Sequence, residues 1–495
     1  MVVPLFSKNI PAIKEFRHVS LRRRQFLGLA ALGATGALVW QGRSLLQGPA
    51  PLPTTVSEIY RSEAGLLELT LEARYGDVIL GGELAPRRMT YNGQIPGPRL
   101  EVKPGDRLII NFKNALDQPT NLHFHGLHLS PSGNQDNVFL HLNPGETFRY
   151  ELQIHPQQRA GTYWYHPHHH GHAAEQLFQG LAGLIVVRGD LDDLPEIRAA
   201  QEEFFVLQDF ALDGPGQGMM AAHMNLMMGR EGSLITVNGL FHPEIAVTKD
   251  LVRLRLLNAS PSRFYRLQLF GQRLTQIAGD NGAFSQPLER DELLLTPGQR
   301  AEVLIQAHGL PKTPIHLLSL PYQRAQMGMM GRQFSGITQA IADFTPKEVP
   351  FTPRRLPQDL IAVEPLPEPS RTRRFTLSHG MVPGQGMAFL INGEAYQDRP
   401  QTTVRLNEIE DWELVNLGTM DHPFHLHVNS FQVLSRNGVP EVPLVWADTV
   451  LVKVGETVKI RVAFRDFVGT TVYHCHILDH EDLGMMGQLE ILPPA

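Results

Sequence analysis

The sequence predicts an all-β protein built from three Greek-key β-sandwich domains. Three observations support this fold class: one short pattern occurs three times, strand-like runs alternate with Gly- and Pro-rich turns, and no run has a convincing long-helix pattern. The chain has 495 residues, including 44 Gly and 37 Pro. A chain of that length is too long for one ordinary core and favours about two to four domains.

The repeated pattern is an Asn-Gly turn followed by apolar strand positions and then a longer strand. The turns lie at Asn92-Gly93, Asn238-Gly239 and Asn392-Gly393. Copies separated by roughly 150 residues indicate three related domains, because a solenoid repeats over a much shorter interval. The longer strands of the three copies are expected at residues 107–113, 252–257 and 411–415.

Two segments mark the boundaries between the predicted domains. The stretch from Phe344 to Pro369 is Pro-rich and has neither a helical nor an alternating pattern, so we assign a linker to residues 346–369. An acidic segment, residues 189–202, separates the first two domains. The predicted organisation is a leader at residues 1–52, a first domain at 53–195, a second domain at 196–345 and a third domain at 370–495.

The N-terminal region has the pattern of an export signal. Arg23-Arg24 is followed by Gln25-Phe26-Leu27, and the run from Phe26 to Trp40 is apolar and uncharged. That run is shorter than the ~20 residues of a membrane span, and a basic region before a short apolar one is typical of a secretory signal. The arginine pair resembles a twin-arginine (Tat) signal, which implies periplasmic or other export of a folded, cofactor-loaded protein. An uncleaved N-terminal anchor is the alternative.

The charge balance argues against a nucleic-acid partner. The formal net charge is -6, and no long basic block follows the N-terminal region. The 22 histidines are a high number for this length and suit a loop-rich β protein that carries metal. We expect no stable membrane span in the mature protein.

The most informative stretch surrounds the single cysteine of the chain, Cys475. His474 and His476 flank it, and His480 and Met485 follow within ten residues. A thiolate, imidazoles and a thioether form the soft-to-borderline donor set that selects copper and builds a blue electron-transfer site with a weak axial Met. The stretch therefore predicts a copper site.

Three further histidine clusters contain His-x-His pairs, whose two side chains point to the same face when the pair lies on a strand. These clusters fall in the first and third predicted domains, so a metal site built from them would lie between those domains. The second domain would then act mainly as a spacer. The clusters are His123-Phe124-His125, the run from Trp164 to His172, and His422-Pro423-Phe424-His425-Leu426-His427.

These four motifs, in this order and at these separations, resemble the multicopper oxidase family in its three-domain laccase-like form. The resemblance covers nearly the whole mature chain and implies three cupredoxin domains and four coppers. This chain fills every ligand position of the family, which argues against its copper-free binding proteins. The implied ligands are His422, Cys475, His480 and Met485 for type 1 copper; His123 and His425 for type 2; and, for the two type 3 coppers, His125, His166 and His476, and His168, His427 and His474.

The family implies one-electron oxidation of a substrate at the type 1 copper and four-electron reduction of oxygen to water at the other three. Two acids stand where such proteins keep proton donors, namely Glu481 and Asp136. A salt bridge or a hydrogen bond that orients a ligand is the alternative role for both. Four other histidines fit the ligand pattern less well and are expected in loops or around the ligands: His128, His169, His170 and His172.

Methionines suggest the substrate. Met420 lies two residues before His422, and thioethers favour Cu(I). Met-rich insertions near the type 1 copper resemble the periplasmic cuprous oxidases, although the acid expected four residues before His422 is replaced by Gly418, with Asp421 adjacent to His422. A helix whose methionines only pack is the alternative. The two Met-rich segments contain Met219, Met220, Met224, Met227 and Met228, and Met327, Met329 and Met330.

The sequence therefore predicts an exported multicopper oxidase that uses oxygen to oxidise Cu(I) and phenolic or other aromatic reductants. One alternative is a general laccase without cuprous specificity. Another, from a different class, is a copper-binding scaffold protein of the cell envelope with the same fold. A nitrite reductase fits less well, because the chain has a third domain and the full trinuclear ligand set.

Overall fold

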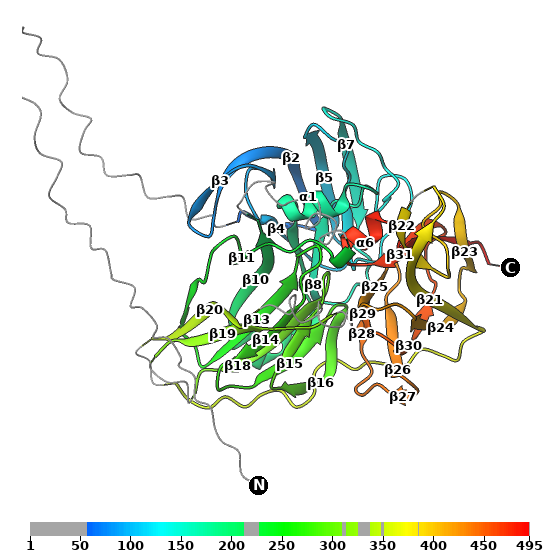
Figure 1. Ribbon diagram of the computed structural model, residues 1–495. Helices are drawn as coiled ribbons and strands as arrows, with labels where there is room; N and C mark the ends of the chain where they lie inside the picture. The colour runs from blue at the N-terminus through cyan, green and yellow to red at the C-terminus, as the bar shows by residue number, and fades with distance from the viewer. Residues whose placement is uncertain are drawn as a thin grey trace, which may run out of the picture. The chain divides into compact units, whose positions relative to one another are not determined.

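The computed structural model describes residues 57–211, 227–308, 313–324, 337–347, 351–384 and 386–494. All of them belong to one compact unit, Pro53–Ala495. Strands dominate this part of the chain (Figure 1). Among these residues, no helix combines the length and apolar character that crossing a membrane requires. The short helices are α1 (Ala173–Gln179), α2 (Asp190–Asp193), α3 (Pro195–Ala199) and α6 (Leu478–Asp482).

The first sandwich has sheets in the order β3-β2-β5-β7 and β1-β4-β9-β8-β6. In β2, Leu67, Leu69 and Leu71 are buried while the residues between them are exposed or half-buried, which is the alternation of a strand with one face on a core. The strands are β1 (Ile59–Arg61), β2 (Leu66–Leu80), β3 (Glu83–Tyr91), β4 (Gly97–Val102), β5 (Arg107–Ala115), β6 (His123–His125), β7 (Thr147–Gln153), β8 (Gly161–His166) and β9 (Gly183–Val187).

The second sandwich has sheets in the order β11-β10-β13-β18-β15-β16 and β12-β20-β19-β14-β17. Its central strand β13 is buried along its whole length, as expected for a strand covered on both faces. The strands are β10 (Gln201–Phe210), β11 (Leu234–Val237), β12 (Glu244–Val247), β13 (Leu251–Asn258), β14 (Tyr265–Leu269), β15 (Leu274–Gly279), β16 (Gly282–Arg290), β17 (Leu293–Leu295), β18 (Arg300–Gln306), β19 (Ile315–Leu320) and β20 (Gln339–Pro346).

The third sandwich has sheets in the order β22-β21-β24-β30-β26-β27, with β28 paired to β26, and β23-β32-β31-β25-β29. The strands are β21 (Arg371–Val382), β22 (Gly386–Ile391), β23 (Pro400–Arg405), β24 (Ile409–Asn416), β25 (His422–Leu426), β26 (Phe431–Arg436), β27 (Val439–Pro440), β28 (Trp446–Ala447), β29 (Thr449–Val452), β30 (Thr457–Ala463), β31 (Gly469–Cys475) and β32 (Met486–Leu492). Six sheets in three pairs confirm the predicted all-β class with three cupredoxin-like sandwiches.

The repeated Asn-Gly turns have the same function in all three sandwiches. Asn92, Asn238 and Asn392 adopt the left-handed conformation with φ of 54°, 54° and 57°, which asparagine tolerates better than other non-glycine residues. The side-chain oxygen of each accepts a backbone N–H from the strand beside the turn: from Glu72 at 2.7 Å, and from Val206 and Thr376 at 2.9 Å. The repeated Asn-Gly pattern therefore corresponds to the same hydrogen bond between a turn and a strand in each sandwich.

The segments at the predicted boundaries contain more structure than expected. Phe344, which the sequence pattern assigned to the Pro-rich stretch, lies in β20 and is fully buried in the second core. Residues 351–369 form no helix or strand, yet Leu360 N–H donates to Ser285 O at 2.9 Å and Leu366 N–H donates to Gln432 Oε1 at 2.8 Å. The linker is therefore tied to both the second and third sandwiches. The exact domain boundaries stay predictions.

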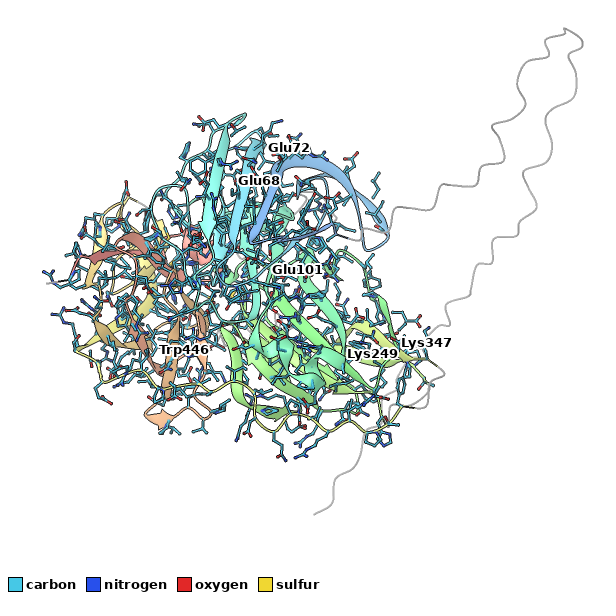
Figure 2. All side chains as sticks on the ribbon, turned by 180° about the vertical axis from the view of Figure 1, so that it is seen from behind. Glu68, Glu72, Glu101, Lys249, Lys347 and Trp446 are labelled. Atoms are coloured by element: carbon cyan, nitrogen blue, oxygen red, sulfur yellow. The ribbon has the colours of Figure 1, made fainter. Side chains whose placement is uncertain are left out.

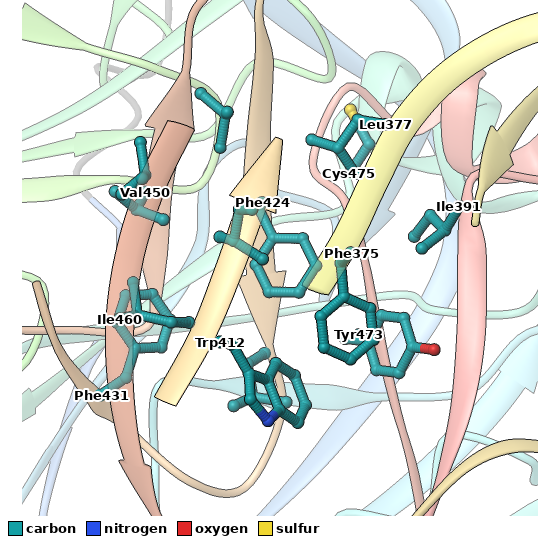
Figure 3. Close-up of a cluster of buried hydrophobic side chains, with 14 of the residues drawn as sticks. Phe375, Leu377, Ile391, Trp412, Phe424, Phe431, Val450, Ile460, Tyr473 and Cys475 are labelled. Carbon is teal, nitrogen blue, oxygen red and sulfur yellow. The ribbon is translucent and has the colours of Figure 1, made fainter. Parts of the chain in front are cut away.

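Aromatic side chains fill the core of the third sandwich next to the single cysteine. Trp412, Phe375 and Tyr473 pack with ring centroids 4.5 to 5.7 Å apart, and Figure 3 shows Cys475 beside this group. Cys475 is 1% exposed. This packing fixes the end of β31, and with it the position of the cysteine.

A cation–π contact joins the first and third sandwiches. The Arg159 guanidinium lies 3.8 Å from the ring centroid of Trp446, which is labelled in Figure 2. Such contacts contribute about 0.5–2 kcal/mol, more when they exclude water. The contact adds to the interface at which the predicted metal ligands of these two sandwiches meet.

Candidate metal centres

One candidate centre consists of a sulfur and two imidazole nitrogens. Cys475 Sγ lies 3.5 Å from His422 Nδ1 and 3.8 Å from His480 Nδ1, and the two nitrogens are 3.4 Å apart. All three side chains are buried. The antiparallel pairing of β25 with β31 brings this about, because Phe424 lies opposite Cys475 and His422 is at the start of β25. The chain turns into α6 directly after β31 and returns His480 to the same point.

The surroundings hold both imidazoles in the orientation a metal would need. His480 Nε2 donates to Met227 O at 3.0 Å, so its Nδ1 keeps a lone pair directed at the sulfur. Phe389 stacks on the His480 ring with centroids 3.7 Å apart. Ile477 N–H donates to Cys475 Sγ at 3.4 Å. The three donors are thus fixed by contacts from both the second and third sandwiches.

Met485 is fully buried in the core that contains Cys475. Its backbone carbonyl accepts Cys475 N–H at 3.0 Å, and its N–H donates to His480 O at 2.8 Å. These two hydrogen bonds keep the methionine in the loop that carries the other donors. The weak axial role of Met485 stays a prediction.

The second candidate centre is a cluster of eight fully buried histidines at the junction of the first and third sandwiches. His168 Nε2 and His427 Nε2 each lie 3.1 Å from His474 Nε2. Groups whose ligand atoms all lie within 4.8 Å of one another are His123, His125 and His425; His125, His166 and His476; and His168, His427 and His474. The structure therefore brings together every histidine of the predicted type 2 and type 3 sets.

Strand pairing and stacking arrange this cluster with approximate symmetry. His123 lies opposite His166 in the β6–β8 pair, and His425 lies opposite His474 in the β25–β31 pair. Across the junction, the His125 ring stacks on His425 and the His123 ring stacks on His427, each with centroids 3.8 Å apart. The His-x-His pairs of the two sandwiches therefore meet face to face.

The far nitrogens of several of these rings are held by protein oxygens, which fixes their tautomers. His166 Nδ1 donates to Pro167 O at 2.9 Å, and His474 Nδ1 donates to Cys475 O at 2.9 Å. The nitrogens that remain are buried and have no hydrogen-bond partner among the described residues: His123 Nε2, His125 Nδ1, His166 Nε2, His425 Nε2, His427 Nδ1, and both ring nitrogens of His476.

These unpaired nitrogens fit a metal cluster. An unsatisfied buried polar group costs about 1–3 kcal/mol, so leaving seven of them in a purely structural core would be expensive. Burial lowers the pKa of His166, His168 and His427 well below the ordinary value. The rings are therefore neutral at pH 7 and offer lone pairs, which is the form that binds copper.

Burial has the opposite effect on the cysteine. It raises the pKa of the Cys475 thiol well above its ordinary value, so the thiol would stay protonated in a metal-free pocket. A coordinated metal removes that proton, because the thiolate is the ligand form. For His422, burial and, to a smaller extent, the proximity of the His379 imidazole lower the pKa to about 3. The donor set therefore suits a soft or borderline metal such as copper.

Asp136 lies on the outer side of the histidine cluster. His123 Nδ1 donates to Asp136 Oδ1 at 2.9 Å, and Phe124 N–H donates to the same oxygen at 3.0 Å. Its side chain is 1% exposed. Of the two roles weighed for this acid from the sequence, the contacts favour orientation of a ligand.

Glu481 lies inside the protein against two histidines of the cluster. Its Oε2 is 3.2 Å from His474 Nδ1 and its Oε1 is 3.8 Å from His168 Nδ1. Burial and the neighbouring Asp482 raise its pKa well above the ordinary value, which favours the protonated form of the carboxyl. A buried acid with a raised pKa next to the cluster has the chemistry of a proton donor.

Sequence reasoning missed two residues of this centre, Asp448 and Arg300. Asp448 Oδ1 lies 2.9 Å from His125 Nε2, and Asp448 O accepts His425 Nδ1–H at 2.8 Å. Arg300, from β18 of the second sandwich, donates to Asp448 Oδ1 at 2.8 Å and is fully buried. No motif marks either residue. The sequence does not show that Arg300 is buried, so it offered no signal for either residue.

The second sandwich is therefore more than the spacer that was expected. Besides Arg300, it supplies Met227 O to His480 and Asn281, whose side-chain amide donates to Asp448 Oδ2 at 2.5 Å. The expectation was wrong because it considered only potential ligands. Residues that orient ligands carry no histidine motif.

The four histidines that fitted the pattern less well lie away from both centres. His128 bonds Asp466 at 2.9 Å, His169 bonds His141 at 2.6 Å, and His172 bonds Gln118 at 2.6 Å. His170 contacts the Tyr396 ring. None belongs to the metal-ligand groups set out above, in agreement with their predicted loop positions.

Most of the predicted Met-rich residues lie outside the described part of the chain, namely Met219, Met220, Met224, Met327, Met329 and Met330. Of the remainder, Met228 and Met420 are buried in the core that contains Cys475. Asp421, which the sequence places next to His422, donates its N–H to Arg324 O at 2.7 Å. Met227, which belongs to the first Met-rich segment, accepts a hydrogen bond from His480 through its carbonyl. Arg324, three residues before the second segment, accepts the N–H of Asp421, the neighbour of His422.

Comparisons with known proteins agree with this geometry. Sequence models of multicopper oxidase domains match residues 72–192, 208–314 and 367–495. The multicopper oxidase mco of Staphylococcus haemolyticus is 28% identical over 454 residues, which cover 88% of this chain and 91% of that protein. The cell division protein FtsP of Dickeya dadantii is 28% identical over 486 residues, covering 95% and 98%.

A solved structure extends the likeness to three dimensions. A multicopper oxidase from Campylobacter jejuni, described as a metallo-oxidase, superposes with a TM-score of 0.76 at 31% identity and covers 88% of this chain and 96% of that one. Because all three parts of the chain match and the likeness spans most of both proteins, the chain belongs to the multicopper oxidase family and, like the oxidases of that family, is a copper-dependent oxidoreductase that uses oxygen.

Proposed function

We propose that this chain binds four coppers and couples one-electron oxidation of a reductant to the reduction of oxygen to water. The observation that carries the proposal is the convergence of eight buried histidines beside a separate Cys-His-His centre. His422, Cys475, His480 and Met485 would hold one copper. The other three would be held by the eight histidines in the sets named from the sequence. When bound, copper would supply electron transfer at Cys475 and oxygen reduction at the cluster.

The chain itself supplies the connection between the two centres. His474 and His476 are the sequence neighbours of Cys475, so the path from Sγ to either imidazole runs through one residue and its adjoining peptide bond. His476 N–H donates to Pro423 O at 2.7 Å, and all three side chains are fully or almost fully buried. This short, rigid path supports electron transfer from the outer centre to the inner one.

Reduction of oxygen to water consumes protons, and we assign their delivery to Glu481. The carboxyl is buried with a raised pKa, and it contacts His474 and His168. Asp136 orients His123 and Phe124 N–H and would contribute by holding the ligand rather than by passing protons.

The reductants we propose are Cu(I) and phenolic or other aromatic compounds. Two features support Cu(I). Thioethers are soft donors for that ion. In addition, Met227 of the first Met-rich segment contacts His480, and Arg324, just before the second segment, contacts Asp421 next to His422. A laccase-like oxidase without cuprous specificity is the alternative within the family.

A copper-binding scaffold is the alternative from a different class, and the likeness to the cell division protein FtsP favours it. The complete set of ligand nitrogens favours the oxidase. Binding to a partner protein does not require a buried cluster of imidazole nitrogens that have no hydrogen-bond partners. Oxygen uptake by the copper-loaded protein distinguishes the two functions. Uptake in the presence of a reductant supports the oxidase, whereas copper binding without oxygen uptake supports the scaffold.

We also propose that the chain is exported in the folded state through the twin-arginine pathway, on the basis of Arg23-Arg24 and the apolar run after it. Replacing Arg23 and Arg24 by Lys should leave the protein in the cytoplasm, as measured by cell fractionation and immunoblotting. Arg17→Lys, outside the motif, is the matched control. Unchanged export of the double variant would exclude this route.

Cys475→Ser should abolish the blue absorption and the oxidase activity, because the thiolate ligand and the start of the covalent path are both lost. The circular dichroism spectrum should not change, since serine fills nearly the same volume, and about three coppers per chain should remain. Visible absorption, oxygen uptake and metal analysis check this. Oxidase activity that persists in the variant contradicts the assignment of Cys475.

Glu481→Gln should slow oxygen reduction by about 10²-fold, the usual effect of removing a positioned proton donor. Anaerobic reduction of the blue centre should keep its rate, because the acid lies at the histidine cluster. Stopped-flow measurements separate the two steps. Glu175→Gln, on the exposed side of α1, is the control. Equal oxygen reduction in the parent and in Glu481→Gln would mean that protons enter elsewhere.

Replacing Met219, Met220 and Met224 by Leu should lower the rate of Cu(I) oxidation while leaving phenol oxidation unchanged, because leucine keeps the apolar volume and removes the soft sulfur donor. Met227 is left unchanged, so that the backbone segment whose carbonyl accepts the His480 Nε2 hydrogen bond is not disturbed. Initial rates with the two reductants give the comparison. If Cu(I) turnover is unaffected, these methionines only pack.

A further inference from the structure

Two histidines and an aspartate converge on the outer face of the second sandwich. His242 Nε2 lies 2.8 Å from Asp343 Oδ1, and His316 Nδ1 lies 2.6 Å from the same oxygen. The centroids of the two imidazole rings are 6.2 Å apart. The strands that carry His316 and Asp343, β19 and β20, lie on the side of the molecule away from β25 and β31 (Figure 1). None of the three residues belongs to the ligand sets described above, so they need a separate explanation.

The pairing of β12, β20 and β19 places these side chains next to one another. Asp343 lies on β20, and His316 is directly opposite it on the antiparallel neighbour β19. His242 comes two residues before Glu244, which is the partner of Asp343 on the parallel neighbour β12. Phe344, the next residue along β20, is buried in the core, so Asp343 points outward and its strand partners share that face.

The backbone at His242 is held in a special conformation. His242 is left-handed, with a φ of 46°, which is uncommon for a residue other than glycine. Asp343 N–H donates to Pro243 O at 2.9 Å, so β20 fixes the residue that follows His242. Residues held in such conformations gather at functional sites, and this one presents its imidazole to a carboxylate.

A second acid lies beside the three groups. Glu244 is exposed, and its side chain has no ion pair or hydrogen bond with any residue that the structure describes. Burial by itself would raise the pKa of Asp343, but hydrogen bonds from His316 and His242 outweigh it and lower that pKa. Neighbouring strands are about 4.8 Å apart, and like charges opposite one another repel. A cation bound here would offset that repulsion.

Both imidazoles can offer a lone pair at the nitrogen that faces Asp343. The opposite ring nitrogens, His242 Nδ1 and His316 Nε2, have no hydrogen-bond partner among the described residues and are not among the buried unpaired atoms. Each can therefore carry the ring proton toward solvent, which leaves the inward nitrogen free to bind a metal.

The donor set selects a divalent ion of intermediate hardness. Zinc(II) takes imidazole nitrogen and carboxylate oxygen at about 2.0–2.2 Å, so donors on one ion lie roughly 3 Å apart. The separations of 2.6 and 2.8 Å found here are close to that value. Calcium and magnesium prefer oxygen ligands alone, and Cu(I) prefers sulfur.

We propose that His242, His316 and Asp343 bind one divalent ion of the zinc class, with Glu244 beside it and water completing its coordination. The site is separate from the two copper centres and does not depend on the proposed oxidase function. β12 is the edge strand of the sheet β12-β20-β19-β14-β17. The ion ties the start of this edge strand to β20 and β19, so its role is structural.

An ion pair alone explains these contacts less well. One imidazole would be enough to pair Asp343, whereas two converge on a single oxygen. Glu244 would also be left next to Asp343 without a partner among the described residues. A divalent ion accounts for both observations.

The binding test uses the copper-loaded protein after dialysis against glycine, a weak chelator that clears exposed sites. In isothermal calorimetry the parent should bind one Zn(II) at this site. His316→Gln and His242→Asn should each weaken the Kd by about 10²-fold. Asparagine is chosen because it tolerates the left-handed backbone. His308→Gln, at an exposed histidine of the same sandwich, is the matched control and should keep the Kd of the parent.

Two further readouts separate metal binding from a folding defect. Zn(II) should raise the melting temperature of the parent and of His308→Gln but not that of His316→Gln, because an ion that binds only the folded state stabilises it. Anomalous diffraction at the zinc edge should give a peak between His242, His316 and Asp343 in the parent. That measurement decides the proposal without any variant.

Three results would overturn the proposal. They are no Zn(II) binding by the parent, an equal Kd in the parent and both histidine variants, and displacement of Zn(II) by an equal concentration of Ca(II). The last would assign the ion to the carboxylates without the imidazoles. None of these results involves oxygen uptake, so the failure of this site would leave the proposed oxidase function untouched.

Discussion

The burial of eight imidazoles at one junction constrains how the three sandwiches are arranged. Seven of their ring nitrogens lack partners among the described residues, and His168, His427 and His474 direct nitrogens at one another over 3.1 Å. Such an arrangement is unfavourable for a core without metal and favourable for one that binds cations. The first and third sandwiches must therefore meet so that the ends of β6, β8, β25 and β31 coincide, and the stacked His123–His427 and His125–His425 pairs are the result.

The second sandwich stabilises that junction electrostatically. Arg300 is fully buried and reaches Asp448, which in turn bonds His125. Burial by itself would raise the pKa of Asp448, but Arg300 and His125 outweigh it and hold that pKa well below the ordinary value. The carboxylate therefore stays charged and fixes the His125 ring. Gly298 contributes by close approach: a Cβ there would lie 2.8 Å from the His476 ring, and its φ of 84° suits glycine.

The three sandwiches and the histidine cluster were predictable from the sequence, because each depends on short local motifs. The Asn-Gly repeats marked the three sandwiches because each Asn fastens a turn to a strand by the same hydrogen bond. The His-x-His pairs marked the cluster because strand geometry sends both rings to one face. Asp448 and Arg300 were not predictable. Each acts through a neighbour that is remote in sequence, Asp448 being 323 residues from His125, and neither belongs to a motif. The spacer role assigned to the second domain was wrong for the same reason.

We propose that these side chains form two separate copper centres in one chain. Anomalous X-ray diffraction on crystals of the copper-loaded protein, collected on both sides of the copper absorption edge, would locate the metal. Four copper peaks per chain are expected: one between His422, Cys475 and His480, and three enclosed by the eight histidines. A single peak at Cys475 with none among the histidines would exclude the second centre, and copper bound only elsewhere on the chain would exclude both.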